Sequence, residues 1–183
     1  IKKIFEKKEV RIYAAVCIVF FLLSAVLSAK YGEDPLKIIR NLLLLTFLSV
    51  IAWIDLQEKR IPNKILVVML AVRLLYLAIE WIAVPQQGMV IAIRSVLGAL
   101  IGGIIFGLCY LIARGGMGAG DVKLMTLVGL YLGNGELLPV MLMIVICSMV
   151  FSIVTLVAKK TTLKSEVPFA PFVFVGTLLA FLI

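Results

Sequence analysis

Residues 138–158 read LPVMLMIVICSMVFSIVTLVA and decide the fold, because this apolar run contains no charged side chain. A helix needs about 20 mostly apolar residues to cross the hydrocarbon core of a bilayer, with a range of about 17 to 25. Residues 138–158 meet that length without a break in the apolar pattern. The run therefore predicts a transmembrane helix.

Similar runs occupy most of the chain. The apolar segments lie at 12–29, 38–54, 65–84, 90–113, 122–133, 138–158 and 168–183. Segment 122–133 is short for a crossing, so we expect a tilted, partly buried or re-entrant helix there. No connector is long enough for a separate soluble domain. Residues 1–183 are therefore predicted to form one integral-membrane domain, an all-α polytopic bundle of about seven helical segments.

The composition agrees with a membrane protein. Apolar residues make up 63% of the chain, charged residues make up 15%, and the mean hydropathy is +1.19. Soluble domains are closer to half apolar and a quarter charged. The net charge of +8 would suggest nucleic acid in a soluble protein. Here most cations lie in short connectors, so we expect the lipid bilayer and no nucleic acid as a partner.

The basic residues also predict the orientation. They concentrate on alternate connectors, at Lys2, Lys3, Lys7, Lys8 and Arg11, at Lys59, Arg60 and Lys64, at Arg114 and Lys123, and at Lys159, Lys160 and Lys164. Cytoplasmic loops carry the excess of Lys and Arg. Seven crossings with a cytoplasmic N-terminus put every rich connector inside and every poor one outside.

The chain contains no histidine. This excludes Ser-His-Asp triads, His-based metalloproteases and Ser-His dyads. The three cysteines, at 17, 109 and 147, are isolated in apolar runs without C-x-x-C spacing, so they are interpreted as small hydrophobic residues. We expect no metal and no cofactor. Acid–base chemistry has to come from carboxylates, Lys, Tyr or Cys.

Two aspartates stand at informative positions. Asp55 closes the second apolar segment, and Asp121 opens the fifth. In the predicted topology both lie near the cytoplasmic boundary of the membrane. Two carboxylates brought close do not both ionise easily, so one keeps a proton while the other stays charged. Such a pair can activate a water and protonate a leaving amide nitrogen, as peptide hydrolysis requires.

Each aspartate also has a simpler interpretation. Asp55 can merely flank a membrane span, and Asp121 can cap a helix N-terminus, where a carboxylate is favoured. The glycines before Asp121 do not form a nucleotide-binding motif, because no strand precedes them and no Walker lysine follows. We instead expect Gly118 and Gly120 to let the backbone approach the aspartate closely.

Three motifs together resemble the type IV prepilin peptidases, which are membrane aspartyl proteases of the GxGD type. They are Asp55 followed by Ile61-Pro62-Asn63, then GAGDVKL at 118–124, and PFAPF at 168–172. The resemblance extends from about residue 55 to the end of the chain. It implies that Asp55 and Asp121 are the catalytic pair. It further implies cleavage of prepilin or pseudopilin leaders after a glycine, at the cytoplasmic face of a prokaryotic inner membrane.

One feature of the family is missing from this sequence. Bifunctional members carry a cytoplasmic domain with paired C-x-x-C motifs, linked to N-methylation of the new terminal residue. No C-x-x-C occurs here. The chain therefore resembles the short, peptidase-only members, and methyl transfer is not expected of it.

Four further residues have two interpretations each. Lys123 belongs to the family-like motif and either tunes the pair or contacts a substrate carboxylate, or it is a snorkelling interfacial lysine. Arg73 lies deep in the third segment and should face the bundle or water, with a glutamate of a pilin-type substrate as a hypothetical partner. Pro168 and Pro171 either break the entry of the last segment or shape the site.

Two other functions fit a small polytopic protein. An ion- or proton-coupled transporter would use Asp55 and Asp121 as relay carboxylates, but it predicts internal repeats and sites at mid-membrane. A non-enzymatic subunit of a pilus or secretion machine is the other alternative. A Ser-Lys peptidase is not favoured, because the serines lie in spans without a motif. The sequence does not indicate the oligomeric state.

Overall fold

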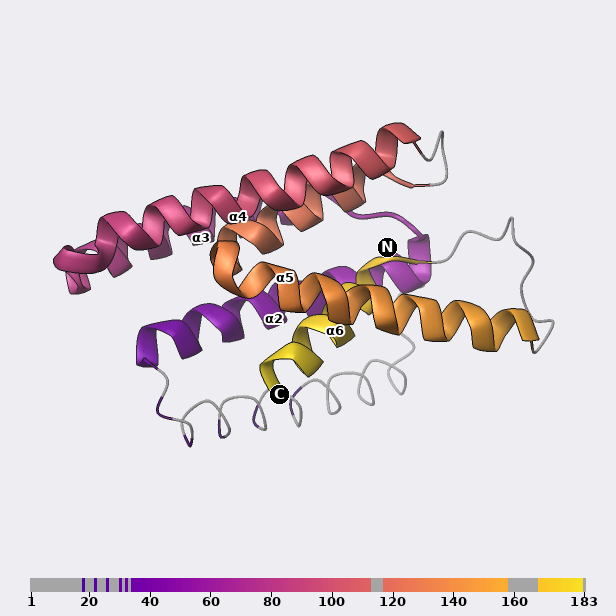
Figure 1. Cartoon of the computed structure of the whole chain (residues 1–183), viewed down its shortest axis with the longest axis horizontal. Coiled ribbons are helices and arrows are strands. Elements are labelled where there is room, and N and C mark those ends of the chain that lie inside the picture. The colour runs from indigo at the N-terminus through magenta and orange to yellow at the C-terminus, as the bar shows by residue number, and fades with distance from the viewer. Residues whose placement is uncertain are drawn as a thin grey trace.

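The computed structural model of the chain describes residues 18, 22, 26, 30, 32, 34–112, 117–157 and 168–182. Within them are five helices, α2 (Pro35–Glu58), α3 (Asn63–Ala83), α4 (Pro85–Ile112), α5 (Ala119–Val157) and α6 (Ala170–Leu182), and no strand (Figure 1). The predicted all-α class is confirmed for this part of the chain.

Helices α2, α3, α4 and α5 are long and apolar enough to cross a membrane. The predicted segment 12–29 lies outside the described residues except at positions 18, 22 and 26. The count of seven segments and the cytoplasmic N-terminus therefore stay predictions.

Two prolines and a lysine in the left-handed conformation mark boundaries of α2 and α4. Pro35 stands in the first turn of α2, where its missing N–H breaks no helical bond. At the other end of α2, Lys59 adopts a left-handed conformation and donates its N–H to Asp55 O at 2.8 Å. Pro85 begins α4 directly after α3 ends, so α4 starts five residues before the predicted position 90.

Helix α5 combines the two predicted segments 122–133 and 138–158. Its helical geometry breaks at Gly133, with φ 72° and ψ 176°, and the chain turns back there (Figure 1). Only glycine adopts such a conformation readily. Nearly every residue from 124 to 133 is buried, so this short half lies in the centre of the bundle, as its predicted partial burial suggested.

Glycines bring α4 and the first half of α5 into backbone contact. A Cβ atom on Gly98 would meet the backbone of Gly129 and Gly133, and one on Gly102 would lie 2.6 Å from Met125 O. These small residues let the two helix backbones approach closely. Gly107 has no such role, because a Cβ atom there would meet nothing within 4 Å.

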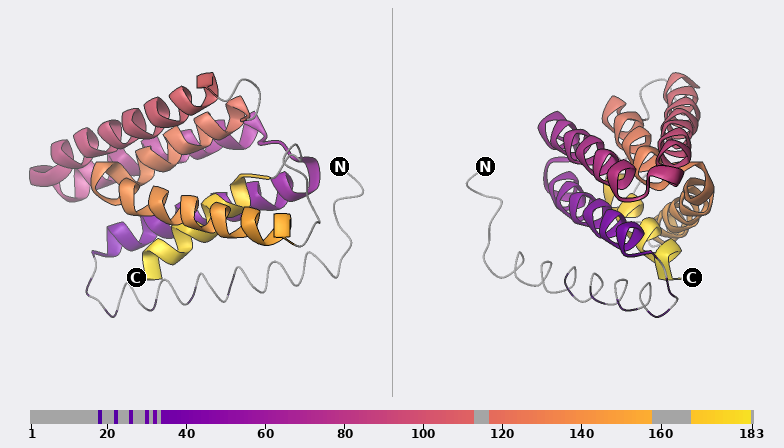
Figure 2. Two further views of the ribbon diagram at one scale, coloured as in Figure 1. Left: turned by 45° about the vertical axis from the view of Figure 1, so that its right-hand side comes forward. Right: turned by 90° about the vertical axis from the view of Figure 1, so that its left-hand side faces the viewer.

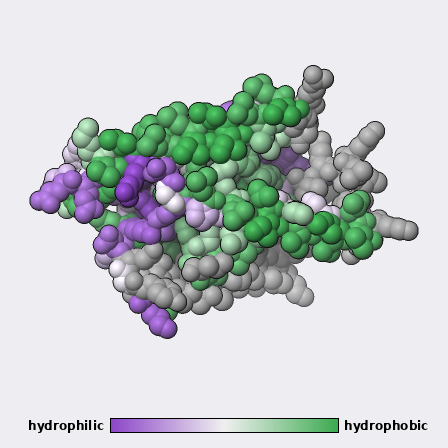
Figure 3. Space-filling model, in the orientation of Figure 1, coloured by the Kyte–Doolittle hydropathy of each residue, from purple (hydrophilic) through white to green (hydrophobic). Residues whose placement is uncertain are grey.

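The helices form a bundle with two distinct ends (Figure 2). The aspartate end contains the C-terminal end (the close) of α2 and the N-terminal ends (the starts) of α3, α5 and α6. The opposite end comprises the starts of α2 and α4, the close of α3 and the break in α5, and we call it the network end. Hydrophilic residues gather at the network end in Figure 3, beside flanks that are largely hydrophobic.

Candidate active site

Asp55 lies one turn before the close of α2 and is buried, with 4% of its surface exposed. Its Oδ2 accepts the backbone N–H of Ala170 at 2.9 Å, and the backbone N–H of Phe169 also bonds to the carboxylate. Both amides belong to the start of α6. Free N–H groups at a helix start stabilise a negative charge. The carboxylate is therefore held by backbone dipoles 115 residues further along the chain.

Asp121 lies in the first turn of α5 and is half-buried. Its Oδ2 accepts the N–H of Gly118 at 3.0 Å, and its own N–H donates to Gly118 O at 3.1 Å. These two bonds fold the segment before α5 around the aspartate. A carboxylate in the first turn also interacts favourably with the helix dipole. The helix-capping interpretation of Asp121 thus describes its local geometry.

The structure brings the two aspartates to the same end of the bundle. The charge of Asp55 acts on the carboxyl group of Asp121, although 66 positions separate them in the sequence. Neither carboxylate forms an ion pair with any residue among 34–112, 117–157 and 168–182. Two uncompensated acids near one another are suited to sharing a proton.

Gly120 packs closely on the segment before α3, whereas Gly118 has room for a side chain. A Cβ atom on Gly120 would lie 3.1 Å from the Cβ atom of Ile61, which precedes α3. One on Gly118 would lie 3.4 Å from Asp121 Oδ2, an ordinary contact distance. Gly120 therefore allows α5 to begin directly against the segment between α2 and α3.

Lys123 bonds to the amide side chain of Asn63 rather than to an acid. Its Nζ donates to Asn63 Oδ1 at 3.1 Å, in an exposed position. The bond joins the first turns of α3 and α5. Asn63 belongs to the Ile61-Pro62-Asn63 motif, and its contact with Lys123 was not predicted, because nothing in the sequence pairs positions 60 residues apart.

Pro168 and Pro171 flank the two amides that bind Asp55. Helix α6 begins at Ala170, so Pro171 occupies its first turn and Pro168 lies just outside it. Proline has no N–H to donate, and the donors come from residues 169 and 170 between them. Sequence reasoning missed these two amides, since backbone donors have no residue-type signature. The ring of Phe169 also packs on Phe106 of α4, with centroids 5.5 Å apart.

Arg73 lies away from the aspartates and has no exposed surface. Its guanidinium donates to Leu130 O at 3.0 Å, to Glu80 Oε2 at 2.8 Å and to Ser95 Oγ at 2.8 Å. The expectation that it faces the bundle is confirmed. A substrate glutamate has no access to this side chain, because groups of the chain itself already surround it.

No group of three or more Cys, Asp or Glu side chains suited to a metal ion occurs among the residues that the structure describes.

Comparison with known proteins identifies the family. Residues 42–157, which include both aspartates, match the type IV leader peptidase family. The chain is also 26% identical over 174 residues to a prepilin leader peptidase/N-methyltransferase of Bacillus subtilis strain 168, an alignment that covers 93% of this chain. The chain spans only about 65% of the length of that relative. No solved structure matches the chain.

The chain therefore belongs to the type IV leader peptidase family, whose members are peptidases of the aspartic type. Its apolar helices and its family together make it a multi-pass membrane protein.

Proposed function

We propose that this chain is an aspartyl endopeptidase that cleaves the leader of prepilin-like proteins after a glycine. Asp55 and Asp121 would act as the catalytic pair, one ionised and one protonated. The ionised carboxylate would take a proton from water as the water attacks the scissile carbonyl, and the protonated one would donate to the departing amide nitrogen. Family membership supports the activity.

The observation that carries the proposal is that Asp55 and Asp121 lie at one end of the bundle, where the charge of Asp55 acts on Asp121. An acid that merely stabilises a fold is usually paired with a base or fully bonded. Among the residues that the structure describes, neither aspartate forms an ion pair, and the Asp121 carboxylate accepts the N–H of Gly118. This arrangement supports proton exchange better than it supports stability.

The N–H groups of Phe169 and Ala170 would orient the Asp55 carboxylate toward the shared site. We propose the peptidase activity for residues 1–183.

The direct test is cleavage of a prepilin-like substrate by the purified chain in detergent. Asp55→Asn and Asp121→Asn should each reduce the cleavage rate by about a thousandfold, because each removes one proton-transfer group. Glu58→Gln is the matched control, since Glu58 is also a carboxylate at the close of α2 but bonds only to exposed Arg60 at 2.9 Å. Full activity in either aspartate variant would refute the catalytic pair.

We also propose that the aspartate end faces the cytoplasm of a prokaryotic inner membrane. The Lys and Arg residues at 59, 60 and 64 support this side. In a chain without its natural cysteines, Arg60→Cys should react with a membrane-impermeant thiol reagent only after permeabilisation. Gln86→Cys, at the other end, should react in intact cells. The reverse pattern would invert the topology.

A further inference from the structure

A cavity of about 460 Å³ opens at the network end of the bundle. Its walls come from the start of α2, the close of α3, the start of α4 and the break in α5. It lies at the opposite end from Asp55 and Asp121, so the proposed peptidase chemistry does not use it. Figure 3 places the hydrophilic surface of the molecule at this end.

Ion pairs neutralise two acids of this cavity. Glu136 bonds to Lys37 at 2.8 Å and to Arg40 at 3.2 Å. Glu80 lies 3.8 Å from Arg40 and 2.8 Å from Arg73. Asp34 and Arg94 also line the cavity, so the described residues of the cavity and its ion pairs include four cations, at 37, 40, 73 and 94, and three anions, at 34, 80 and 136. The excess of one positive charge favours an anionic ligand.

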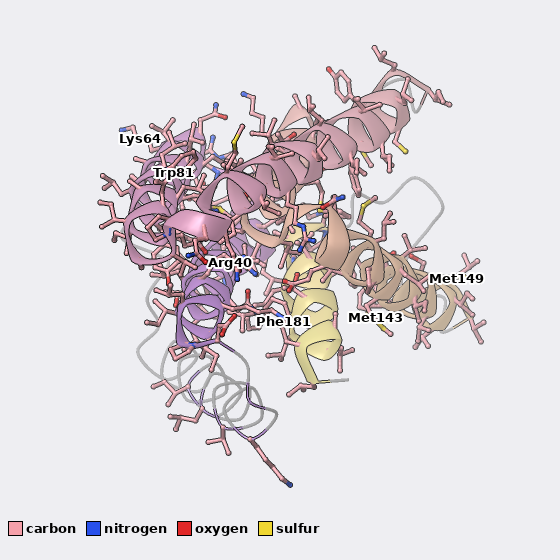
Figure 4. All side chains as sticks on the ribbon, turned by 60° about the vertical axis from the view of Figure 1, so that its left-hand side comes forward. Arg40, Lys64, Trp81, Met143, Met149 and Phe181 are labelled. Atoms are coloured by element: carbon pink, nitrogen blue, oxygen red, sulfur yellow. The ribbon has the colours of Figure 1, made fainter. Side chains whose placement is uncertain are left out.

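Two arginines of the cavity carry donors without a partner among the residues that the structure describes. Arg94 lines the cavity with an exposed side chain and forms no ion pair or hydrogen bond with those residues. Arg40, which is labelled in Figure 4, has a side chain that is only 12% exposed and a buried Nε without a hydrogen-bond partner among them. Buried donors are normally bonded, so the Nε of Arg40 beside a polar cavity points to an absent acceptor.

The cavity lies where lipid headgroups are expected. Trp81, near the close of α3, is half-exposed and packs on Gly88, and an interfacial tryptophan marks the headgroup level. Ile82 and Met89 beside it expose apolar side chains that suit acyl chains. The polar cavity, with its excess positive charge, suits the headgroup of a phospholipid, and the exposed apolar side chains beside it suit the acyl chains.

We propose that this cavity binds the phosphate group of a phospholipid headgroup, with Arg94 and the Nε of Arg40 as donors. A planar guanidinium donates two N–H bonds to phosphate oxygens and carries its charge at any physiological pH. The site is independent of the proposed peptidase activity.

The experiment is native mass spectrometry of the full chain in detergent, titrated separately with phosphatidylglycerol, diacylglycerol and inorganic phosphate. We expect phosphatidylglycerol to bind and diacylglycerol, which lacks the phosphate, not to bind. Equal binding of both lipids would overturn the proposal. Arg94-dependent binding of inorganic phosphate without binding of the lipid would confirm the phosphate chemistry and overturn the lipid source.

Three variants test the residues. Arg94→Gln should weaken lipid binding about tenfold, the size of one lost charge-assisted bond. Asp34→Asn should strengthen it, because this change removes an acid that lines the cavity and forms no ion pair among the described residues. Arg60→Gln, an exposed arginine at the aspartate end, is the matched control and should bind as the parent chain does. Unchanged binding in Arg94→Gln would overturn the site.

Discussion

Acidic side chains have different kinds of bonding partners at the two ends of the bundle. At the network end, Glu80 and Glu136 each contact two basic side chains. At the aspartate end, Asp55 and Asp121 accept backbone N–H groups, and the charge of Asp55 acts on Asp121. Both ends contain buried polar groups in an apolar protein. The difference supports the proposal that the two aspartates, which form no ion pair among the described residues, are the acids available for chemistry.

The strongest test of this difference is to remove one charge at each end of the bundle and to measure the free energy of unfolding. Arg73→Met should lower the free energy of unfolding by about 3–5 kcal/mol, because it leaves Glu80 buried beside one distant arginine. Asp121→Asn should change it by less than about 1 kcal/mol, since its amide contact persists. Thermal unfolding in detergent measures both. An equal loss of unfolding free energy in the two variants would contradict the proposed difference between the ends.

A double variant tests whether the lost stability comes from leaving Glu80 without its arginine. Arg73→Met combined with Glu80→Leu should recover much of the lost stability, because replacing both members of a buried pair by apolar groups is close to neutral. If the double variant is less stable than Arg73→Met alone, the pairing with Arg40 carries more of the network than the geometry indicates.

A substitution at the break in α5 is expected to lower the free energy of unfolding by a smaller amount. Gly133→Ala should destabilise the chain by about 2 kcal/mol, since φ 72° with ψ 176° is strained for any residue with a Cβ atom. Gly135→Ala is the matched control, because its Cβ atom would meet nothing within 4 Å and its φ is not positive. Similar unfolding temperatures for the two variants would contradict the role of Gly133.

The smallest effect is expected at Lys123. Its bond to Asn63 is exposed, so Lys123→Gln should change the free energy of unfolding by no more than about 0.5 kcal/mol. Cleavage should fall about two- to fivefold, because the bond joins the two helix starts beside Asp121. Lys64→Gln, an exposed lysine that follows Asn63, should cleave at the parent rate. A loss as large as in Asp121→Asn would make Lys123 part of the catalytic chemistry instead.

Much of the helical fold could be predicted from the sequence, because apolar runs with charged or proline-containing connectors leave little choice of element. The predicted runs 38–54 and 65–84 correspond to α2 and α3 with shifts of a few residues. Asp55 and Asp121 stood out for the same reason, as acids at the borders of apolar runs.

The contacts between distant residues could not be predicted. The Arg73–Glu80 pair lies two helical turns apart and depends on Ser95 and Leu130 from two other helices. The donors to Asp55 are backbone amides, for which the side chains of Phe169 and Ala170 give no indication. Only the packing of α6 against α2 reveals them.

That packing has a consequence for biosynthesis. Asp55 emerges from the ribosome long before the N–H groups that hold its carboxylate, which belong to residues 169 and 170. In the newly made protein the Asp55 carboxylate therefore lacks these two donors until the last helix has been inserted and docked. If Asp55 is catalytic as proposed, cleavage activity would begin only once the bundle is assembled.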